Sequence, residues 1–418
     1  MKLSLAAAGI FLLSCGVLAI REDEQVVILS GDTQGYLSPC GCTTPMVGGI
    51  RRRAAAIRKL TAPGRTTLLE NGGLVEGFGR QDQMKAETIV QGMAELGVSA
   101  INVSASDARL GSGMLLELSQ LSGHKMVSLS VEHPEDHAFA SMIRSGPFLV
   151  GGVCDTPGSL AGILGARAVS VDEAVKSLVE AADESNVKPV LMLQGGHDAA
   201  VRIARANPRL ALIQYSSIGD PPGRLEVVGE TAIATNGEHG KHIVRLLFRE
   251  GRFSGYQSVA LGPQVRDDPT IGRYYAAYLK RVREEKLLEA LPRRRTQGYS
   301  GSWACMPCHQ AAGHIWKLSS HRSALSTLEK DGHDADPDCV NCHVVGLEST
   351  RGFRSRSATP QLAGVGCENC HGPGLSHVRN PSGSKLSRVS ARACAGCHNP
   401  LNSPNFDFTE YWRKIVHR

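Results

Sequence analysis

The residues best suited to chemistry lie in the last third of the chain, where four pairs of cysteines are each followed directly by a histidine. The pairs are Cys305 and Cys308, Cys339 and Cys342, Cys367 and Cys370, and Cys394 and Cys397, and the histidines are His309, His343, His371 and His398. In the pattern Cys-x-x-Cys-His, two thiols one helical turn apart meet the vinyl groups of one porphyrin, and the histidine becomes the proximal ligand of its iron. Four copies predict four covalently bound c-type haems, because neither zinc sites nor disulfides require a histidine at that fixed position.

Each haem iron needs a sixth ligand or keeps an open position. Apart from the motif histidines, the candidates after residue 300 are His314, His321, His333, His377 and His417.

Residues 298–418 resemble the nitrifier-type tetrahaem cytochrome c family. The matching segments include Ser320-His321, Asp336-Pro337-Asp338-Cys339 and His371-Gly372-Pro373-Gly374. By position, this resemblance implies that His321, His377 and His417 are distal ligands. The remaining haem either takes His333 or His314, of which we favour His333, or stays open to a small ligand such as nitric oxide or carbon monoxide.

The composition is that of a folded globular protein. The chain has 418 residues, 42% of them hydrophobic and 21% charged, with a formal net charge of +6. These values exclude disorder, collagen and a polytopic membrane protein. The eight propionates of four haems would more than offset the positive charge, so the sequence gives no argument for a nucleic-acid partner. So many haems in so short a segment leave little room for an apolar core, and we expect the porphyrins to take its place.

The first residues have the pattern of an export signal. A short positive start is followed by an apolar run too short to span a membrane, which ends in Leu12-Leu13-Ser14-Cys15-Gly16. This resembles a bacterial lipobox, so residues 1–15 are interpreted as a signal peptide and Cys15 as a lipidation site that attaches the protein to a membrane. Ordinary cleavage after Ala19 is the alternative. Both predict an exported protein, and the first predicts a periplasmic or outer-membrane lipoprotein.

Residues 16–262 alternate short apolar runs with helical patterns. Runs at 26–29, 66–69 and 100–103 are each followed by a helical segment, at 50–60, 84–96 and 115–121, and a later series begins at residue 189. Such alternation predicts an α/β fold with a largely parallel sheet, whose sites form where the strands end.

This region resembles the metallophosphoesterase domain of periplasmic 5′-nucleotidases, through Gly31-Asp32, Pro39-Cys40-Gly41-Cys42 and Gly48-Gly49. The resemblance implies a layered α/β sandwich and a site for two metal ions. Of the family's ligands, only Asp32, Asn71 and His197 have candidates here. Gln34, Gly73 and Ser104 stand where a histidine, the bridging aspartate and an asparagine are expected. We therefore expect a retained scaffold without hydrolysis and without a second metal site.

Cys40 and Cys42 leave an alternative open, a thiolate metal site with Asp32 and with His197 or His239. A reduced structural pair, or a link from one of them to Cys154, is the simpler interpretation. Residues 263–297 are strongly charged and predict a solvated helical linker.

Together these patterns predict an exported multihaem cytochrome that passes single electrons between redox protein partners. Two alternatives are an active phosphoesterase with an accessory haem module, and a redox enzyme acting on a small nitrogen or sulfur substrate at an open haem.

Overall fold

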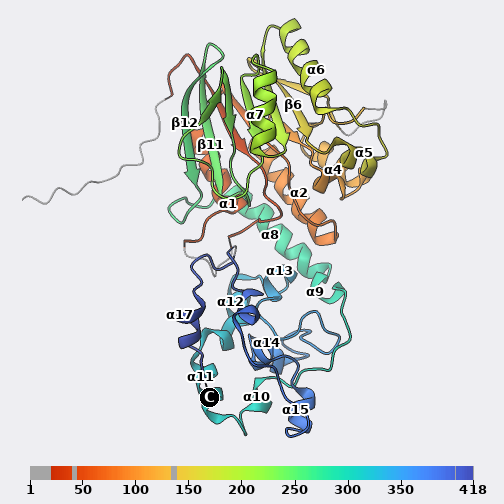
Figure 1. Cartoon of the computed structure of the whole chain (residues 1–418), viewed down its shortest axis with the longest axis vertical. Helices are drawn as coiled ribbons and strands as arrows, with labels where there is room; N and C mark the ends of the chain where they lie inside the picture. Colours follow the sequence, from red (N-terminus) through yellow and green to blue (C-terminus); the bar gives the residue numbers. More distant parts are fainter. Residues whose placement is uncertain (1–19, 40–44, 133–138, 401, 418) are drawn as a thin grey trace, which may run out of the picture.

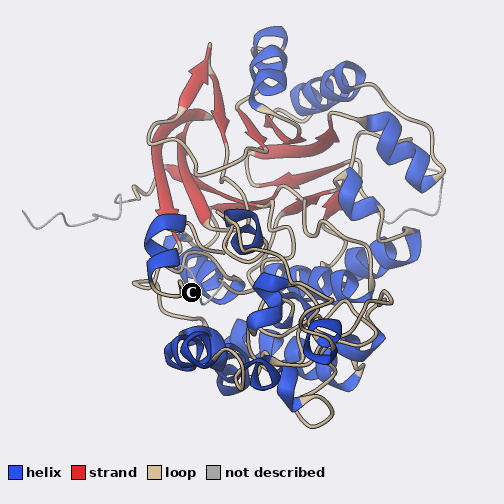
Figure 2. Ribbon diagram, turned by 60° about the horizontal axis from the view of Figure 1, so that its bottom comes forward, coloured by secondary structure: helices blue, strands red, loops and turns tan. Residues whose placement is uncertain are grey.

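Two six-stranded sheets form the N-terminal lobe of the computed structural model, which describes residues 20–39, 45–132, 139–400 and 402–417 (Figures 1 and 2). The first sheet has the order β12 (Arg252–Ala260), β11 (His242–Arg249), β1 (Glu24–Ser30), β2 (Thr66–Glu70), β3 (Ala100–Asn102) and β4 (Met126–Val127). The second has the order β5 (Met142–Ser145), β6 (Phe148–Cys154), β7 (Lys188–Gln194), β8 (Leu212–Tyr215), β10 (Thr231–Ala234) and β9 (Glu226–Val228). Strands β1 to β4 are parallel, as are β6, β7, β8 and β10.

The sheets pack face to face because the strands bury both of their faces. In β1, Val27 and Leu29 point into the core between the sheets, while Val26 and Ile28 point to the outer face, as the two-residue period of a strand requires. Helices α1 (Ile50–Leu60), α2 (Arg80–Glu95) and α4 (Ser112–Leu121) cover the first sheet, and α6 (Val171–Glu184) and α7 (His197–Ala206) cover the second. Shorter helices are α3 (Ala105–Ala108) and α5 (Pro157–Leu164). The predicted layered α/β sandwich is confirmed.

Helix α8 (Pro269–Glu284) joins the lobes and is followed by α9 (Leu287–Ala290). Asp268 caps its first turn by accepting hydrogen bonds from the N–H groups of Thr270 and Ile271. Ile271, Tyr275, Tyr278 and Val282 are buried at helical spacing against α1 and α2. The expectation of a solvated connector is therefore wrong for this face, because the charged residues of α8 occupy only its other side.

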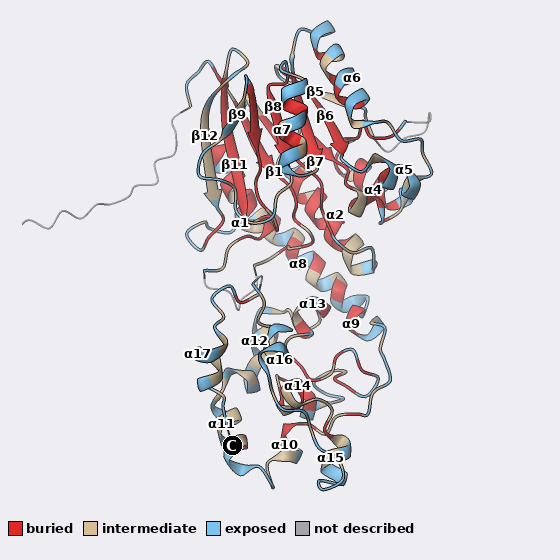
Figure 3. Ribbon diagram, in the orientation of Figure 1, coloured by how far each residue is buried: buried red, intermediate tan, exposed pale blue. Residues whose placement is uncertain are grey.

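The C-terminal lobe is built of short helices and loops, and Figure 2 shows strands only in the other lobe. Its elements are α10 (Ser302–Cys305), α11 (Gln310–Leu318), η1 (Ser320–Ser323), α12 (Ala324–Asp331), α13 (Pro337–Val340), η2 (Pro360–Leu362), α14 (Cys367–His371), α15 (Leu375–Arg379), α16 (Ala391–Ala395) and α17 (Phe408–Arg413). One small apolar cluster forms around Val340, Val344 and Phe353, and most other side chains are half-buried or exposed (Figure 3). The predicted loop-rich, mainly α lobe is confirmed.

Candidate functional site

Each Cys-x-x-Cys-His motif of the C-terminal lobe lies on a turn of helix. The N–H of His309 donates to the carbonyl of Cys305 at 3.0 Å, and that of His398 donates to the carbonyl of Cys394 at 2.8 Å. Helix α14 spans the whole third motif, while α13 carries Cys339 of the second. A helical turn places the two thiols of a motif on one side of the backbone, which is the arrangement expected for attachment to one porphyrin.

Three motif histidines each face a distant histidine. The ring centres of His309 and His377 are 6.3 Å apart, those of His398 and His321 are 6.2 Å apart, and those of His371 and His417 are 5.9 Å apart. An imidazole nitrogen binds a metal ion at about 2 Å, so two imidazoles on opposite sides of one iron have ring centres roughly 6 Å apart. The structure thus brings together each distal candidate that the family resemblance implies with a different proximal histidine.

Five histidines of this lobe, four of them members of these pairs, are hydrogen-bonded through Nδ1, and four of the five partners are backbone carbonyl oxygens. The acceptors are the carbonyl oxygens of Ala324 for His343, Ser387 for His371, Ser384 for His377 and Ile415 for His417, with the Ser403 hydroxyl beside His398. A carbonyl oxygen only accepts, so Nδ1 must carry the hydrogen and Nε2 keeps the lone pair that binds a metal. Metal-ligating histidines are commonly oriented in this way.

His343 differs from the other motif histidines, because within the described residues no imidazole ring lies opposite it. His333 lies nearby, but its Nδ1 is 3.9 Å from the Cys339 sulfur and its Nε2 is 3.5 Å from the Tyr275 hydroxyl. His314 is exposed on α11. The structure therefore does not pair either of the two remaining candidates with His343.

The motifs are not evenly distributed in the lobe. Helix α10 of the first motif contacts α14 of the third, which contacts α16 of the fourth. The thiols of Cys305 and Cys367 are close enough to hydrogen-bond. The second motif lies instead beside α12 and the N-terminal lobe.

Glu368, inside the third motif, joins these elements through its buried carboxylate. It accepts hydrogen bonds from the backbone N–H groups of Ser300 at 2.9 Å, Gly301 at 2.8 Å and Gly374 at 2.7 Å. These groups precede α10 and α15, so one side chain positions the first motif, the third motif and the helix that carries His377.

Asp32 occupies the end of β1 in the N-terminal lobe, where its carboxylate is buried. Gln194 Nε2 donates to Oδ1 at 3.0 Å, and Ser216 Oγ lies 3.0 Å from both carboxylate oxygens. Asn71 in turn donates to Ser216 Oγ at 3.1 Å. Burial raises the pKa of Asp32 to about 7, although these hydrogen bonds oppose the shift.

Comparisons with known proteins found a family for part of the C-terminal lobe. Residues 304–372 match the family described as cytochrome c554 and c-prime. Cytochrome c-554 of Nitrosomonas europaea is 35% identical over 91 residues, which is 18% of this chain and 39% of that protein. The chain thus spans well under half the length of this relative. The match supports a c-type cytochrome in the C-terminal lobe.

Solved structures share the fold of the N-terminal lobe. A 5′-nucleotidase precursor from Thermus thermophilus has 17% identity and a TM-score of 0.52, covering 74% of this chain and 68% of that chain. The sulfate thiohydrolase SoxB of the same organism has 15% identity and a TM-score of 0.52, covering 72% and 68%. These likenesses confirm the 5′-nucleotidase-like fold.

The residues at the strand ends do not fit a pair of metal ions. Asp32 is hydrogen-bonded to an amide and a hydroxyl, and the end of β2 carries Asn71. Among the described residues, no three His, Cys, Asp or Glu side chains come together as a metal site would require. Gln194 and Ser216, which follow β7 and β8, were missed at the sequence level because neither is a typical metal ligand.

His197 does not join Asp32. It begins α7 on the surface, where Nε2 lies 2.6 Å from Glu226 Oε2 and the side chain is 46% exposed. The carboxylate of Glu226 raises the pKa of His197. The structure thus pairs His197 with Glu226 and shows no contact between His197 and Asp32 among the described residues. Cys15, Cys40 and Cys42 lie outside the described residues.

Proposed function

We propose that the chain is an exported tetrahaem cytochrome c that passes single electrons between redox protein partners. The observation that carries this proposal is the set of three imidazole pairs with ring centres 5.9–6.3 Å apart. Each pair joins a motif histidine to a histidine far along the chain, and such a spacing suits one iron between the two rings.

The side chains of the lobe hold and orient the cofactors. Eight cysteines would bind the four porphyrins, and the Nδ1 hydrogen bonds hold the ligand rings in place. When bound, the haems supply one-electron oxidation and reduction. The contacts of α10 with α14 and of α14 with α16 place the first, third and fourth motifs side by side, which favours electron transfer among their haems.

The haem of the second motif is proposed to keep one open position. The hydrogen bond of His343 Nδ1 to the Ala324 carbonyl leaves Nε2 available for one axial position. In the described part of the chain no imidazole lies opposite His343 to fill the other. A second candidate function, redox chemistry on a small nitrogen or sulfur compound, rests on this site. Carbon monoxide should accordingly bind at no more than one haem per chain.

The N-terminal lobe is proposed to be a scaffold without phosphoesterase activity. A bridging hydroxide between two metals needs several anionic or imidazole ligands, whereas the cluster around Asp32 offers Asn71, Gln194 and Ser216. Gln194 and Ser216 already donate to the carboxylate oxygens of Asp32 that a metal would require.

Export with a lipid anchor at Cys15 is proposed for the whole chain. No helix in the described ranges is long and apolar enough to cross a membrane. Replacing Cys15 by Ala should move the protein from the membrane fraction to the soluble fraction, and unchanged fractionation would contradict the anchor.

Counting the metals of the purified holoprotein tests the proposal. We expect four irons per chain, no zinc, manganese or other transition metal, and an alkaline pyridine spectrum of thioether-linked haem. One or two additional metals together with phosphoester hydrolysis would overturn the scaffold role, and fewer than four covalent haems would overturn the cofactor assignment.

A further inference from the structure

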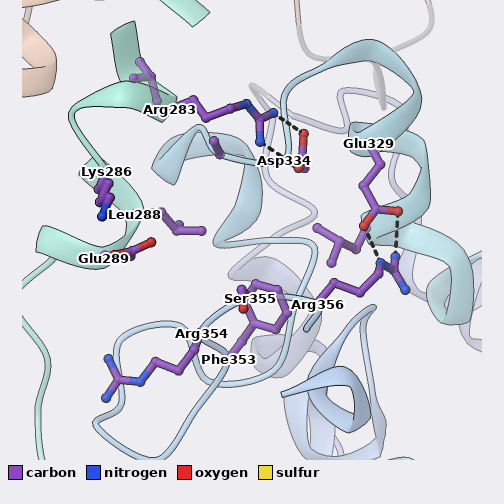
Figure 4. A pocket seen from close by; sticks show the side chains of 13 residues that line it. Arg283, Lys286, Leu288, Glu289, Glu329, Asp334, Phe353, Arg354, Ser355 and Arg356 are labelled. Atoms are coloured by element: carbon purple, nitrogen blue, oxygen red, sulfur yellow. Dashed lines mark hydrogen bonds and ion pairs between the residues drawn. The ribbon is translucent and has the colours of Figure 1, made fainter. Parts of the chain in front are cut away.

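The two lobes meet at the turn that leads into the second haem-binding motif. This turn, residues 334–338, carries three aspartates, and each of them is bonded to the N-terminal lobe or to α8. Asp334 Oδ1 lies 2.7 Å from Arg283 Nη2 (Figure 4). Asp336 accepts from the Gln81 amide at 2.7 Å and from the Tyr278 hydroxyl at 3.0 Å. Asp338 pairs with Lys85.

Lys85 reaches this turn from α2 and is largely enclosed. Its side chain is only 11% exposed, and its aliphatic part packs against Gly35 in the loop that follows Asp32. A side chain at position 35 would press on Lys85, and Gly35 also has a φ of +81°, so glycine suits both the backbone and the contact. The loop that follows Asp32 thus positions a buried cation beside the haem domain.

The local charges keep Lys85 protonated. Burial alone would lower its pKa, but Asp338, aided by Asp336 and Asp82, more than offsets this effect and raises it. Asp338 is the more solvated partner, with 59% of its side chain exposed, so water screens its charge better than that of Lys85. The two charges therefore do not cancel, and a positive electrostatic potential remains near the buried ammonium of Lys85.

We propose that Lys85 is a positioning residue for the second haem, and that its charge raises the redox potential of that haem above the value it would have without the N-terminal lobe. This inference rests on the proposed function. Asp338 immediately precedes Cys339, which would bind the porphyrin, so the Lys85 ammonium lies beside the attachment site of this haem.

The expected sign follows from electrostatics. Reduction lowers the charge of a haem by one unit, and a nearby cation favours the reduced form while a nearby anion favours the oxidised form. The effect is stronger where little water screens it, as at the buried ammonium of Lys85. Removing Lys85 should lower the potential of the second haem, and removing the charge of Asp338 should raise it.

The test is a potentiometric titration of the holoprotein and of the variants Lys85→Met, Lys85→Arg and Asp338→Asn. We expect one of the four midpoint potentials to fall in Lys85→Met, to rise in Asp338→Asn and to return toward the wild-type value in Lys85→Arg. The other three midpoints should stay unchanged. Lys176→Met is the matched control, because Lys176 forms an exposed pair with Glu180 on α6, away from the haem lobe.

Opposite signs distinguish a charge effect from a loss of structure, because a loosened turn would shift the potential in the same direction in both variants. Equal signs, or shifts no larger than that of Lys176→Met, would overturn the inference. If Lys85→Met does not fold, Lys85→Gln, which keeps most of the aliphatic stem, tests the same loss of charge. A wild-type protein without covalent haem would contradict the proposed function instead.

Discussion

His377 illustrates how the surroundings of a histidine in the C-terminal lobe determine whether it can bind a haem iron. It lies on α15, with Nδ1 bonded to the Ser384 carbonyl and its ring facing His309. His314, on α11, is exposed and has no such partner ring among the described residues. The two histidines have the same chemistry, and only their surroundings separate the proposed axial ligand from a surface residue.

Replacing His377 by Ala should open the iron coordinated by His309. Carbon monoxide would then bind at one more haem per chain than in the wild-type protein, because the sixth position has lost its imidazole. The carbon monoxide difference spectrum of the reduced protein measures this. His314→Ala should leave the spectrum unchanged, and an equal increase in both variants would contradict the proposed pairing.

The buried carboxyl of Asp32 makes the free energy of unfolding of the N-terminal lobe depend on pH. Its pKa of about 7 in the folded chain compares with ~3.9 in an unfolded one. Between these values the folded chain holds a proton that the unfolded chain has lost, so the free energy of unfolding falls as the pH rises from about 4 to about 7. The loss is at most about 4 kcal/mol.

The Asp32→Asn variant should therefore lose less stability than the wild-type protein between pH 5 and pH 8. Thermal unfolding of the N-terminal lobe, followed by far-ultraviolet circular dichroism at both pH values, checks this. Parallel pH profiles for the two proteins would show that Asp32 does not titrate in this range.

At the scale of elements, the short helices of the C-terminal lobe depend on one another. Helix α14 contributes Glu368, whose carboxylate accepts the N–H groups that precede α10 and α15. Helices of about five residues are unstable alone, so their arrangement comes from such bonds and from the haems that would bind them. The central position of Glu368 could not be inferred from its place within a Cys-x-x-Cys-His motif.

Glu368→Ala should destabilise this lobe strongly. The change leaves three backbone donors without their acceptor, and one unpaired buried donor costs about 1–3 kcal/mol. We expect a loss of at least about 3 kcal/mol, measured by haem absorbance during thermal unfolding of the holoprotein. Glu410→Ala, at an exposed position on α17, is the control. Equal stability of the two variants would contradict the role of Glu368.

At the scale of the whole molecule, α8 makes the two lobes one structure. Its Tyr275 and Tyr278 are buried between α2 and the second motif, and the Tyr278 hydroxyl donates to Asp336 at 3.0 Å. Burial, with the nearby charge of Asp336, raises the pKa of Tyr278, so the phenol remains a donor at all physiological pH values.

Tyr278→Phe should weaken the contact between the lobes by about 1–2 kcal/mol, because buried Asp336 loses one of its two donors from across the boundary. Denaturant unfolding of the holoprotein measures the change. Tyr274→Phe is the matched control, because the Tyr274 hydroxyl donates to the exposed Glu95 at 3.2 Å. We expect this control to change the free energy of unfolding little. Similar losses in both variants would argue against a contribution from the interface.

Features that depend on neighbouring residues could be predicted from the sequence alone. The Cys-x-x-Cys-His motifs predict the attachment and proximal residues because one turn of helix contains the whole motif. The alternation of apolar runs and helical patterns predicted the α/β fold, and the resemblance to 5′-nucleotidases implied the layered sandwich; Val26 to Leu29 illustrate the fold by burying both faces of β1.

Which distant residues meet could not be predicted from the sequence. His371 and His417 come together because the chain after α17 returns to α14, and Gln194 and Ser216 reach Asp32 because the two sheets pack face to face and β1, β7 and β8 end at the same end of the sandwich. His197, three residues beyond Gln194, already lies on the surface. The many charged residues of α8 led to the prediction of a solvated linker, although one face of the helix is buried. Local patterns specify local chemistry, whereas contacts between distant residues depend on how complete elements pack.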